Sequence, residues 1–101
     1  MKIAELFSVS GKIAIVTGGS RGIGEMIAAG FLANGVKVYI TARKEAALIK
    51  KAEELATMYE GECIPVPCDL STMDGMSDFV DFIQSKEEHI DFLINNAGAS
   101  W

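Results

Sequence analysis

The stretch TGGSRGIG at residues 17–24 contains the residue types in this sequence that are best suited to chemistry. It follows a run of β-branched residues and precedes a helical pattern. Glycines at a strand-to-helix turn let backbone N–H groups approach a ligand closely, and the positive end of the helix dipole points at the same place. Because Arg21 adds a full positive charge to this turn, we expect the ligand to be an anion.

The glycine spacing differs from two common phosphate-binding loops. Gly18-x-x-x-Gly22-x-Gly24 is not GxGxxG, because Ile27 stands where the third glycine would be, and it is not a P-loop, because no lysine follows Gly24. A methyltransferase loop is also glycine-rich after a first strand. That class usually needs an acidic residue at the end of the second strand, and the sequence has none there.

The end of the second apolar segment, VYITARK at residues 38–44, bears on which anion is bound. A dinucleotide places its pyrophosphate at the helix N-terminus, and its adenosine ribose is read at the end of the second strand. An acid there would bind a free 2′-hydroxyl, but the sequence has Ala42 and Arg43. A guanidinium matches a phosphate with paired donors. Arg21 and Arg43 together therefore predict NADP as the cofactor.

Four apolar segments must position these residues. We expect strands at 12–17, 37–41, 63–67 and 91–95, with the prolines marking the third as an edge strand. Between them, apolar residues recur with a period of about 3.6 and predict three helices. The three stripes are Ile23, Ile27 and Phe31; Leu48, Ala52, Leu55 and Tyr59; and Met76, Phe79, Val80 and Ile83.

The third helix should begin at Ser71, with Asp74 completing a variant of the capping box. We expect the Met, Phe and Tyr side chains of the stripes to be core. Gly19 and Gly30 should serve only turn geometry and close helix packing. With right-handed crossovers, the alternation of strands and helices predicts an α/β fold, a Rossmann-type doubly wound parallel sheet, in one domain over residues 1–101.

Composition and charge exclude several classes of protein. Half of the 101 residues are apolar, so a small core is expected and a disordered chain is not. The apolar runs are too short to span a bilayer, and the N-terminus lacks a secretory apolar stretch, so we expect a cytoplasmic protein without a membrane partner. A net charge of −5 disfavours nucleic acid as a partner. Cys63 and Cys68 have neither redox nor zinc spacing, which predicts free thiols and no metal site.

Three motifs in order, TGGSRGIG at 17–24, CDL at 68–70 and NNAG at 95–98, resemble the short-chain dehydrogenase/reductase family of the classical type. The resemblance covers essentially the whole chain. The opening LFSVSGKIAIVTGGSRGIG and the closing NNAGASW are most similar to 3-oxoacyl-(acyl-carrier-protein) reductase-like members, those of the rhamnolipid pathway included. A member of this family would reduce a ketone, for example a 3-oxoacyl thioester, with NADPH, and would be a homo-oligomer.

The resemblance implies a role for each matching residue. The cofactor phosphates would be lined by Gly18, Ser20, Arg21, Gly22, Ile23 and Gly24. Arg43 would hold the 2′-phosphate, and Asp69 and Leu70 would contact the adenine. The adenosine ribose and neighbouring backbone would be met by Asn95, Ala97 and Gly98.

The family's catalytic Ser, Tyr and Lys, with an upstream Asn, lie beyond the NNAG segment. The tyrosines of this sequence are Tyr39 and Tyr59, and Tyr39-x-x-x-Arg43 imitates the Tyr-x-x-x-Lys spacing by accident, since arginine cannot release a proton as lysine can. We therefore assign no catalytic residue and expect residues 1–101 to be an NADP-binding N-terminal portion that is inactive by itself. The alternatives are a stand-alone nucleotide-binding or interaction module and a methyltransferase-like fragment.

Overall fold

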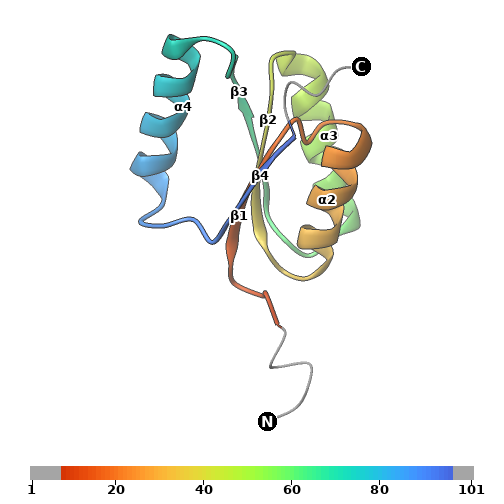
Figure 1. Cartoon of the computed structure of the whole chain (residues 1–101). Helices are drawn as coiled ribbons and strands as arrows, with labels where there is room; N and C mark the ends of the chain where they lie inside the picture. The colour runs from red at the N-terminus through yellow and green to blue at the C-terminus, as the bar shows by residue number, and fades with distance from the viewer. Residues whose placement is uncertain (1–7, 97–101) are drawn as a thin grey trace.

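Strands and helices alternate along the chain in the computed structural model, which describes residues 8–96 (Figure 1). In order, these elements are β1 (Ile13–Thr17), α2 (Gly22–Ala33), β2 (Lys37–Ala42), α3 (Glu45–Met58), β3 (Cys63–Pro67), α4 (Met73–Lys86) and β4 (Phe92–Asn95). Each strand lies within one residue of its predicted limits at either end. Short apolar segments therefore predicted the strands well.

The four described strands form one parallel sheet in the order β3-β2-β1-β4. Ile15 at the centre of β1 is opposite Tyr39 of β2 and Leu93 of β4. The chain first moves outward from β1 to β3 and then crosses back to β4, so α2 and α3 cover one face and α4 the other (Figure 1). This confirms the predicted doubly wound fold, with the proline-containing β3 at an edge.

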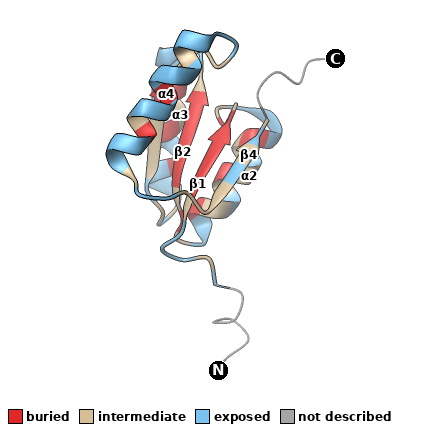
Figure 2. Cartoon of the chain, turned by 60° about the vertical axis from the view of Figure 1, so that its left-hand side comes forward, coloured by how far each residue is buried: buried red, intermediate tan, exposed pale blue. Residues whose placement is uncertain are grey.

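Alternate residues of the central strands enter two different cores. On the face towards α2 and α3, Val16 and Ile40 are fully buried with Leu32 and Leu48. The residues between them point to the other face, where the core comprises Ile15, Tyr39, Val66, Phe79 and Ile83. Figure 2 shows β1 and β2 buried along their length and β4 more open. Each fully buried side chain of this size contributes about 1.5–3 kcal/mol.

The predicted apolar stripe of α2 is out of phase with its buried face. Ile23 is 67% exposed, whereas Gly24, Ala28 and Leu32 are buried. The reason is steric, because a Cβ at Gly24 would lie 2.2 Å from the carbonyl oxygen of Gly18, so only glycine lets the helix start this close to the turn. Glycine therefore takes the inner face at the start of α2, followed by Ala28 and Leu32.

The expectation that the methionine of the α4 stripe is core is wrong, because Met76 is 44% exposed. On α4 only Phe79 and Ile83 of the predicted stripe are buried, while Met76 and Val80 are partly exposed beside a groove. The stripe of α3 is confirmed, since Leu48, Ala52 and Leu55 are buried and Tyr59 packs against them.

Local chemistry at two further positions also differs from expectation. Helix α4 is capped by Thr72, whose hydroxyl accepts from the N–H of Gly75 at 3.0 Å, and not by Ser71. Gly30 faces open space and therefore has no packing role, whereas a Cβ at Gly19 would lie 2.6 Å from Ile40 Cγ2. Gly19 thus does allow close packing, as predicted.

Both cysteines are free, and they pack on opposite faces of the sheet, Cys63 towards α2 and α3 and Cys68 towards α4. Within residues 8–96, no helix is long and apolar enough to cross a membrane.

Candidate functional site

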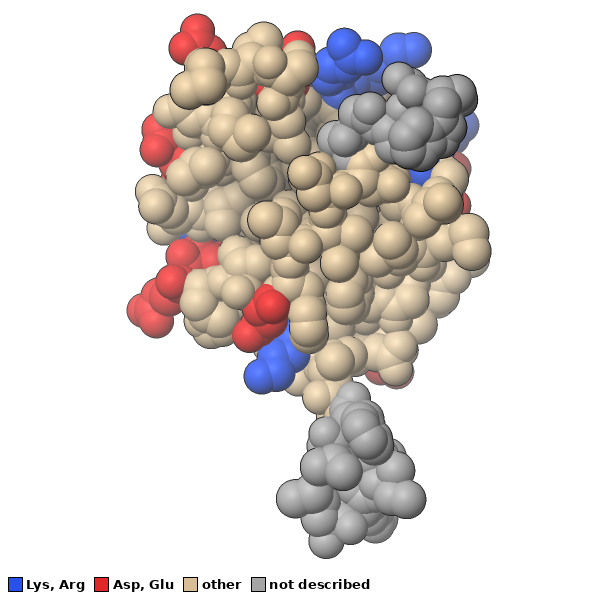
Figure 3. Space-filling model, in the orientation of Figure 1, with Lys and Arg blue, Asp and Glu red and all other residues tan. Residues whose placement is uncertain are grey.

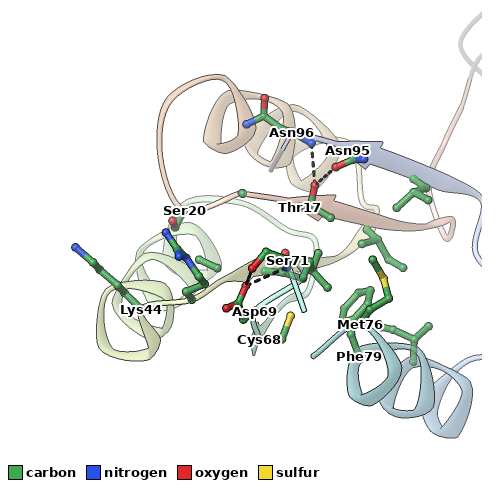
Figure 4. A pocket seen from close by; sticks show the side chains of 18 of the residues that line it. Thr17, Ser20, Lys44, Cys68, Asp69, Ser71, Met76, Phe79, Asn95 and Asn96 are labelled. Carbon is green, nitrogen blue, oxygen red and sulfur yellow. Dashed lines mark hydrogen bonds between the residues drawn. The ribbon is translucent and has the colours of Figure 1, made fainter. Parts of the chain in front are cut away.

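A groove of about 1750 Å³ runs along the carboxyl ends of the strands (Figure 4). It is lined by the ends of β1, β2 and β4, the glycine turn after β1, residues 68–71 after β3, and one side of α4. Sites for small molecules usually occupy about 300–1,000 Å³, so this groove has room for an extended ligand. Its position, where the strand order reverses at β1, is where open α/β sheets bind ligands.

The glycine turn forms one wall of the groove. Gly18 and Gly22 have φ of 67° and 61°, values that favour glycine, and Gly18 donates its N–H to the carbonyl of Thr41 at 2.9 Å. Helix α2 starts immediately after Arg21, whose side chain makes no capping hydrogen bond. The N–H groups of a first helical turn have no partner within the helix, and together with the dipole they favour an anion.

Thr17 joins the ends of β1 and β4 beneath this wall. Its buried hydroxyl accepts from the N–H of Asn96 at 2.8 Å and donates to the side-chain oxygen of Asn95 at 3.0 Å (Figure 4). Thr17, Asn95 and Asn96 all line the groove. We did not single out Thr17 from the sequence, although its place at the head of TGGSRGIG was the available signal.

Basic side chains line the part of the groove near the glycine turn and the end of β2. Arg21 from the glycine turn and Arg43 from the end of β2 both line it, and both are exposed. Lys44, the N-cap residue of α3, lines the same end and was missed from the sequence, where its only signal was adjacency to Arg43. Figure 3 shows Lys and Arg side chains gathered at the top of the molecule and acidic side chains along the α4 side.

Asp69 faces this basic end, but its carboxylate is engaged by its own loop. Asp69 Oδ1 accepts from the backbone N–H of Ser71 at 3.0 Å and from the Ser71 hydroxyl at 2.6 Å (Figure 4). These hydrogen bonds, first that of the hydroxyl, lower the pKa of Asp69, and the charge of Arg43 lowers it further. Asp69 is therefore negative at neutral pH, and its carboxylate is oriented before any ligand arrives.

Cys68 lies next to Asp69 and lines the groove. Burial raises the pKa of its thiol, and the negative charge of Asp69 raises it further. The thiol therefore stays protonated at neutral pH, which argues against a nucleophilic role.

The structure brings together nine of the twelve predicted cofactor residues: Gly18, Ser20, Arg21, Gly22, Ile23, Arg43, Asp69, Leu70 and Asn95 all line the groove. Gly24 does not line it, because it lies against Gly18 beneath the turn. Ala97 and Gly98 lie outside the described residues. Tyr39 does not line it either, since it is 1% exposed and its hydroxyl donates to Glu87.

A parallel sheet of this winding, with a glycine turn at a helix N-terminus and basic residues at the end of β2, defines a dinucleotide-binding fold of the Rossmann type. The model of the short chain dehydrogenase family matches residues 12–101. The chain belongs to this family, which confirms the resemblance seen in the three sequence motifs.

Several relatives share high similarity with the chain. The rhamnolipids biosynthesis 3-oxoacyl-[acyl-carrier-protein] reductase of Pseudomonas aeruginosa is 44% identical over 95 residues, covering 94% of this chain and 36% of that protein. The solved complex of Pseudomonas aeruginosa RhlG with NADP superposes with a TM-score of 0.86 at 44% identity, covering 93% of this chain and 37% of that one. L-sorbose reductase from Gluconobacter frateurii, complexed with NADPH and L-sorbose, gives 0.86 at 34% identity, covering 93% and 36%. The chain spans about a third of the length of these relatives.

Proposed function

We propose that this chain forms the NADP-binding part of an oxidoreductase that reduces a ketone to an alcohol. The observation that carries the proposal is that Arg21 and Arg43, from two separate segments of the chain, both line the groove. A 2′-phosphate placed between them would receive two charge-assisted interactions, whereas NADH has no group to occupy that place. The complexes of two relatives with NADP and NADPH support the same cofactor.

Three segments that line the groove would contact different parts of the cofactor. Backbone N–H groups from Ser20 to Ile23, helped by the N-terminus of α2, would bind the pyrophosphate. The Asp69–Leu70 segment would meet the adenine, and Asn95, with Ala97 and Gly98, the adenosine ribose. Asn96 and Thr17 fix the end of β4 and thereby orient Asn95. The bound nicotinamide would supply hydride to the carbonyl carbon of the substrate.

The substrate class rests on the relatives. One is named as a 3-oxoacyl-[acyl-carrier-protein] reductase, and another is complexed with a ketose, L-sorbose. Both names imply a ketone as substrate, and we propose a 3-oxoacyl thioester as the first to test. In the longer protein that these relatives imply, the Ser, Tyr and Lys of the family would lie downstream of the NNAG segment. We further propose that the protein is a homo-oligomer and that it is located in the cytoplasm.

The proposal is tested by titration calorimetry of the chain with NADPH, NADH and S-adenosylmethionine. We expect NADPH to bind about ten- to a hundredfold more tightly than NADH, since a hydrogen bond to a charged group contributes about 1.5–3 kcal/mol. Arg43→Ala should remove most of this preference. Lys50→Ala, which removes a positive charge from the exposed side of α3 outside the groove, is the matched control. Equal affinity for NADPH and NADH, or binding of S-adenosylmethionine alone, would contradict the proposal.

A further inference from the structure

Helix α4 begins in very close contact with the loop that closes the adenosine end of the groove. A Cβ at Gly75, in the first turn of α4, would lie 1.9 Å from the carbonyl oxygen of Asp69 and 2.8 Å from its carbonyl carbon. Gly75 has an ordinary helical conformation, so the glycine is required for space and not for its backbone angles. Alanine is favoured over glycine in helices, and a glycine here needs a reason outside the helix.

The hydroxyl of Thr72 connects the two partners of this contact. It donates to the carbonyl of Asp69 at 3.2 Å and accepts from the N–H of Gly75 at 3.0 Å. The backbone N–H of Thr72 points at the same carbonyl, at 3.4 Å. Within this turn, Ser71 also holds the Asp69 carboxylate through its N–H and hydroxyl. The position of Asp69 is therefore set by the first turn of α4.

On its other side, the same loop is attached to the end of β2. The N–H of Cys68 donates to the carbonyl of Ala42 at 3.0 Å, and Arg43 follows directly. Leu70 packs into the core that contains Phe79. Figure 4 shows Asp69 and Ser71 across the groove from Thr17 and Asn96. A shift of the Asp69 carbonyl would thus move one wall of the groove. The displacement would also affect the basic end, where Arg43 lies.

We propose that Gly75 is a positioning residue that sets the adenosine end of the groove, by allowing α4 to hold the Asp69–Leu70 segment in register with Arg43. This inference rests on the proposed function. Any side chain at position 75 has to push the carbonyl and the helix apart by about 1.5 Å to reach the 3.4 Å of ordinary contact. The loop is exposed at Ser71 and Thr72, so we expect these residues to take up most of the displacement.

The test compares three glycine-to-alanine variants of the chain. Calorimetry uses NADPH and adenosine 2′,5′-bisphosphate, which carries only the adenosine end of the cofactor, and the melting temperature is recorded for each. Gly75→Ala should weaken both ligands by about tenfold, the loss expected when about one hydrogen bond to the ligand is broken. Gly30→Ala faces open space and should leave affinity unchanged. Gly61→Ala, whose Cβ would meet Val36 O at 2.3 Å away from the groove, should lower the melting temperature without changing affinity.

Two further measurements separate positioning from general loss of structure. The Asp69 carboxyl, followed by NMR, should titrate below its usual range in the wild-type chain, and its pKa should rise in Gly75→Ala because the Ser71 hydrogen bonds loosen. Should Gly75→Ala fail to fold, Thr72→Val removes the hydroxyl link without added bulk, and Thr72→Ser restores it. We expect Thr72→Val to weaken adenosine 2′,5′-bisphosphate and Thr72→Ser to bind it as wild type does.

Wild-type affinity and wild-type Asp69 titration in Gly75→Ala would overturn the inference, as would equal binding by Thr72→Val and Thr72→Ser. Absence of NADPH and adenosine 2′,5′-bisphosphate binding by the wild-type chain would instead overturn the proposed function. The titration of Asp69 in Gly75→Ala then still decides whether Gly75 positions the loop.

Discussion

The hydroxyl of Thr17 accepts a hydrogen bond from the backbone N–H of Asn96 at 2.8 Å, and this bond joins the carboxyl ends of β1 and β4. The two residues are 79 positions apart in the chain. They meet where the strand order reverses, the part of the sheet beside which the groove opens. The buried side chain of Thr17 thus adds to the backbone pairing of the two strands at the end where they flank the proposed cofactor.

Replacing this hydroxyl should destabilise the fold. In Thr17→Val the N–H of Asn96 loses its acceptor, which we expect to lower the free energy of unfolding by about 1–3 kcal/mol. Thr17→Ser keeps the hydroxyl and should be closer to wild type. Urea denaturation of both variants measures the difference, and equal stability of Thr17→Val and Thr17→Ser would show that the bond contributes nothing.

Gly24 and Gly30 lie on the same helix but should respond oppositely to alanine. Gly24→Ala would place its Cβ 2.2 Å from Gly18 O and 2.8 Å from Asn96 Nδ2, so α2 must move away from the glycine turn. We expect it to lower stability by about 1–3 kcal/mol, the usual cost of overpacking. Gly30→Ala has open space and should raise stability by about 0.5–1 kcal/mol, because alanine is the better helix former. Thermal unfolding of the two variants checks the sign of each change.

Acid should weaken the contact between β2 and the end of α4. Glu87, the C-cap residue of α4, accepts from the hydroxyl of Tyr39 and pairs with Lys37. The hydrogen bond from Lys37, then that from Tyr39, lowers the pKa of Glu87 below its usual 4.5. Because the folded-state pKa is the lower one, the contribution is present above about pH 4.5 and is lost as the pH falls through the folded-state value.

The variant that checks this is Glu87→Gln, which keeps the shape of the side chain and removes its charge. Its stability should be lower than that of the wild type at neutral pH and should fall less between pH 5 and about pH 3. Denaturation at several pH values measures both slopes, with Glu88→Gln, at an exposed neighbour, as the matched control. Parallel slopes for all three proteins would rule out Glu87 as the source of acid sensitivity.

Leu93 should make the chain prone to self-association. It lies on β4, at an edge of the described sheet, and is 65% exposed. Edges of this kind pair with other chains unless a charge blocks them. Leu93→Lys should therefore reduce association in sedimentation velocity at high protein concentration, whereas Met58→Lys, an exposed apolar residue on α3, should not. If the two variants self-associate to a similar extent, the surface responsible for association lies elsewhere.

Patterns within short stretches of sequence were enough to predict the fold. Strand limits, the parallel sheet and the glycine turn follow from apolar segments, helical periods and the spacing of Gly18, Gly22 and Gly24. Most of the predicted cofactor residues also line the groove, because they lie at or shortly after the carboxyl ends of strands, and these ends lie together in a parallel sheet. These features depend on residues that are close together in the sequence, so the sequence pattern is enough to predict them.

Contacts between distant segments decided the rest. The inward face of α2 depends on how closely Gly24 approaches Gly18, which periodicity alone does not reveal. Likewise the bond from Thr17 to Asn96 and the contact between Gly75 and Asp69 exist only once the sheet and α4 have packed. Local patterns report which face of an element is apolar, whereas distances of 2–3 Å between backbone and side chains are set by how the packed elements fit together.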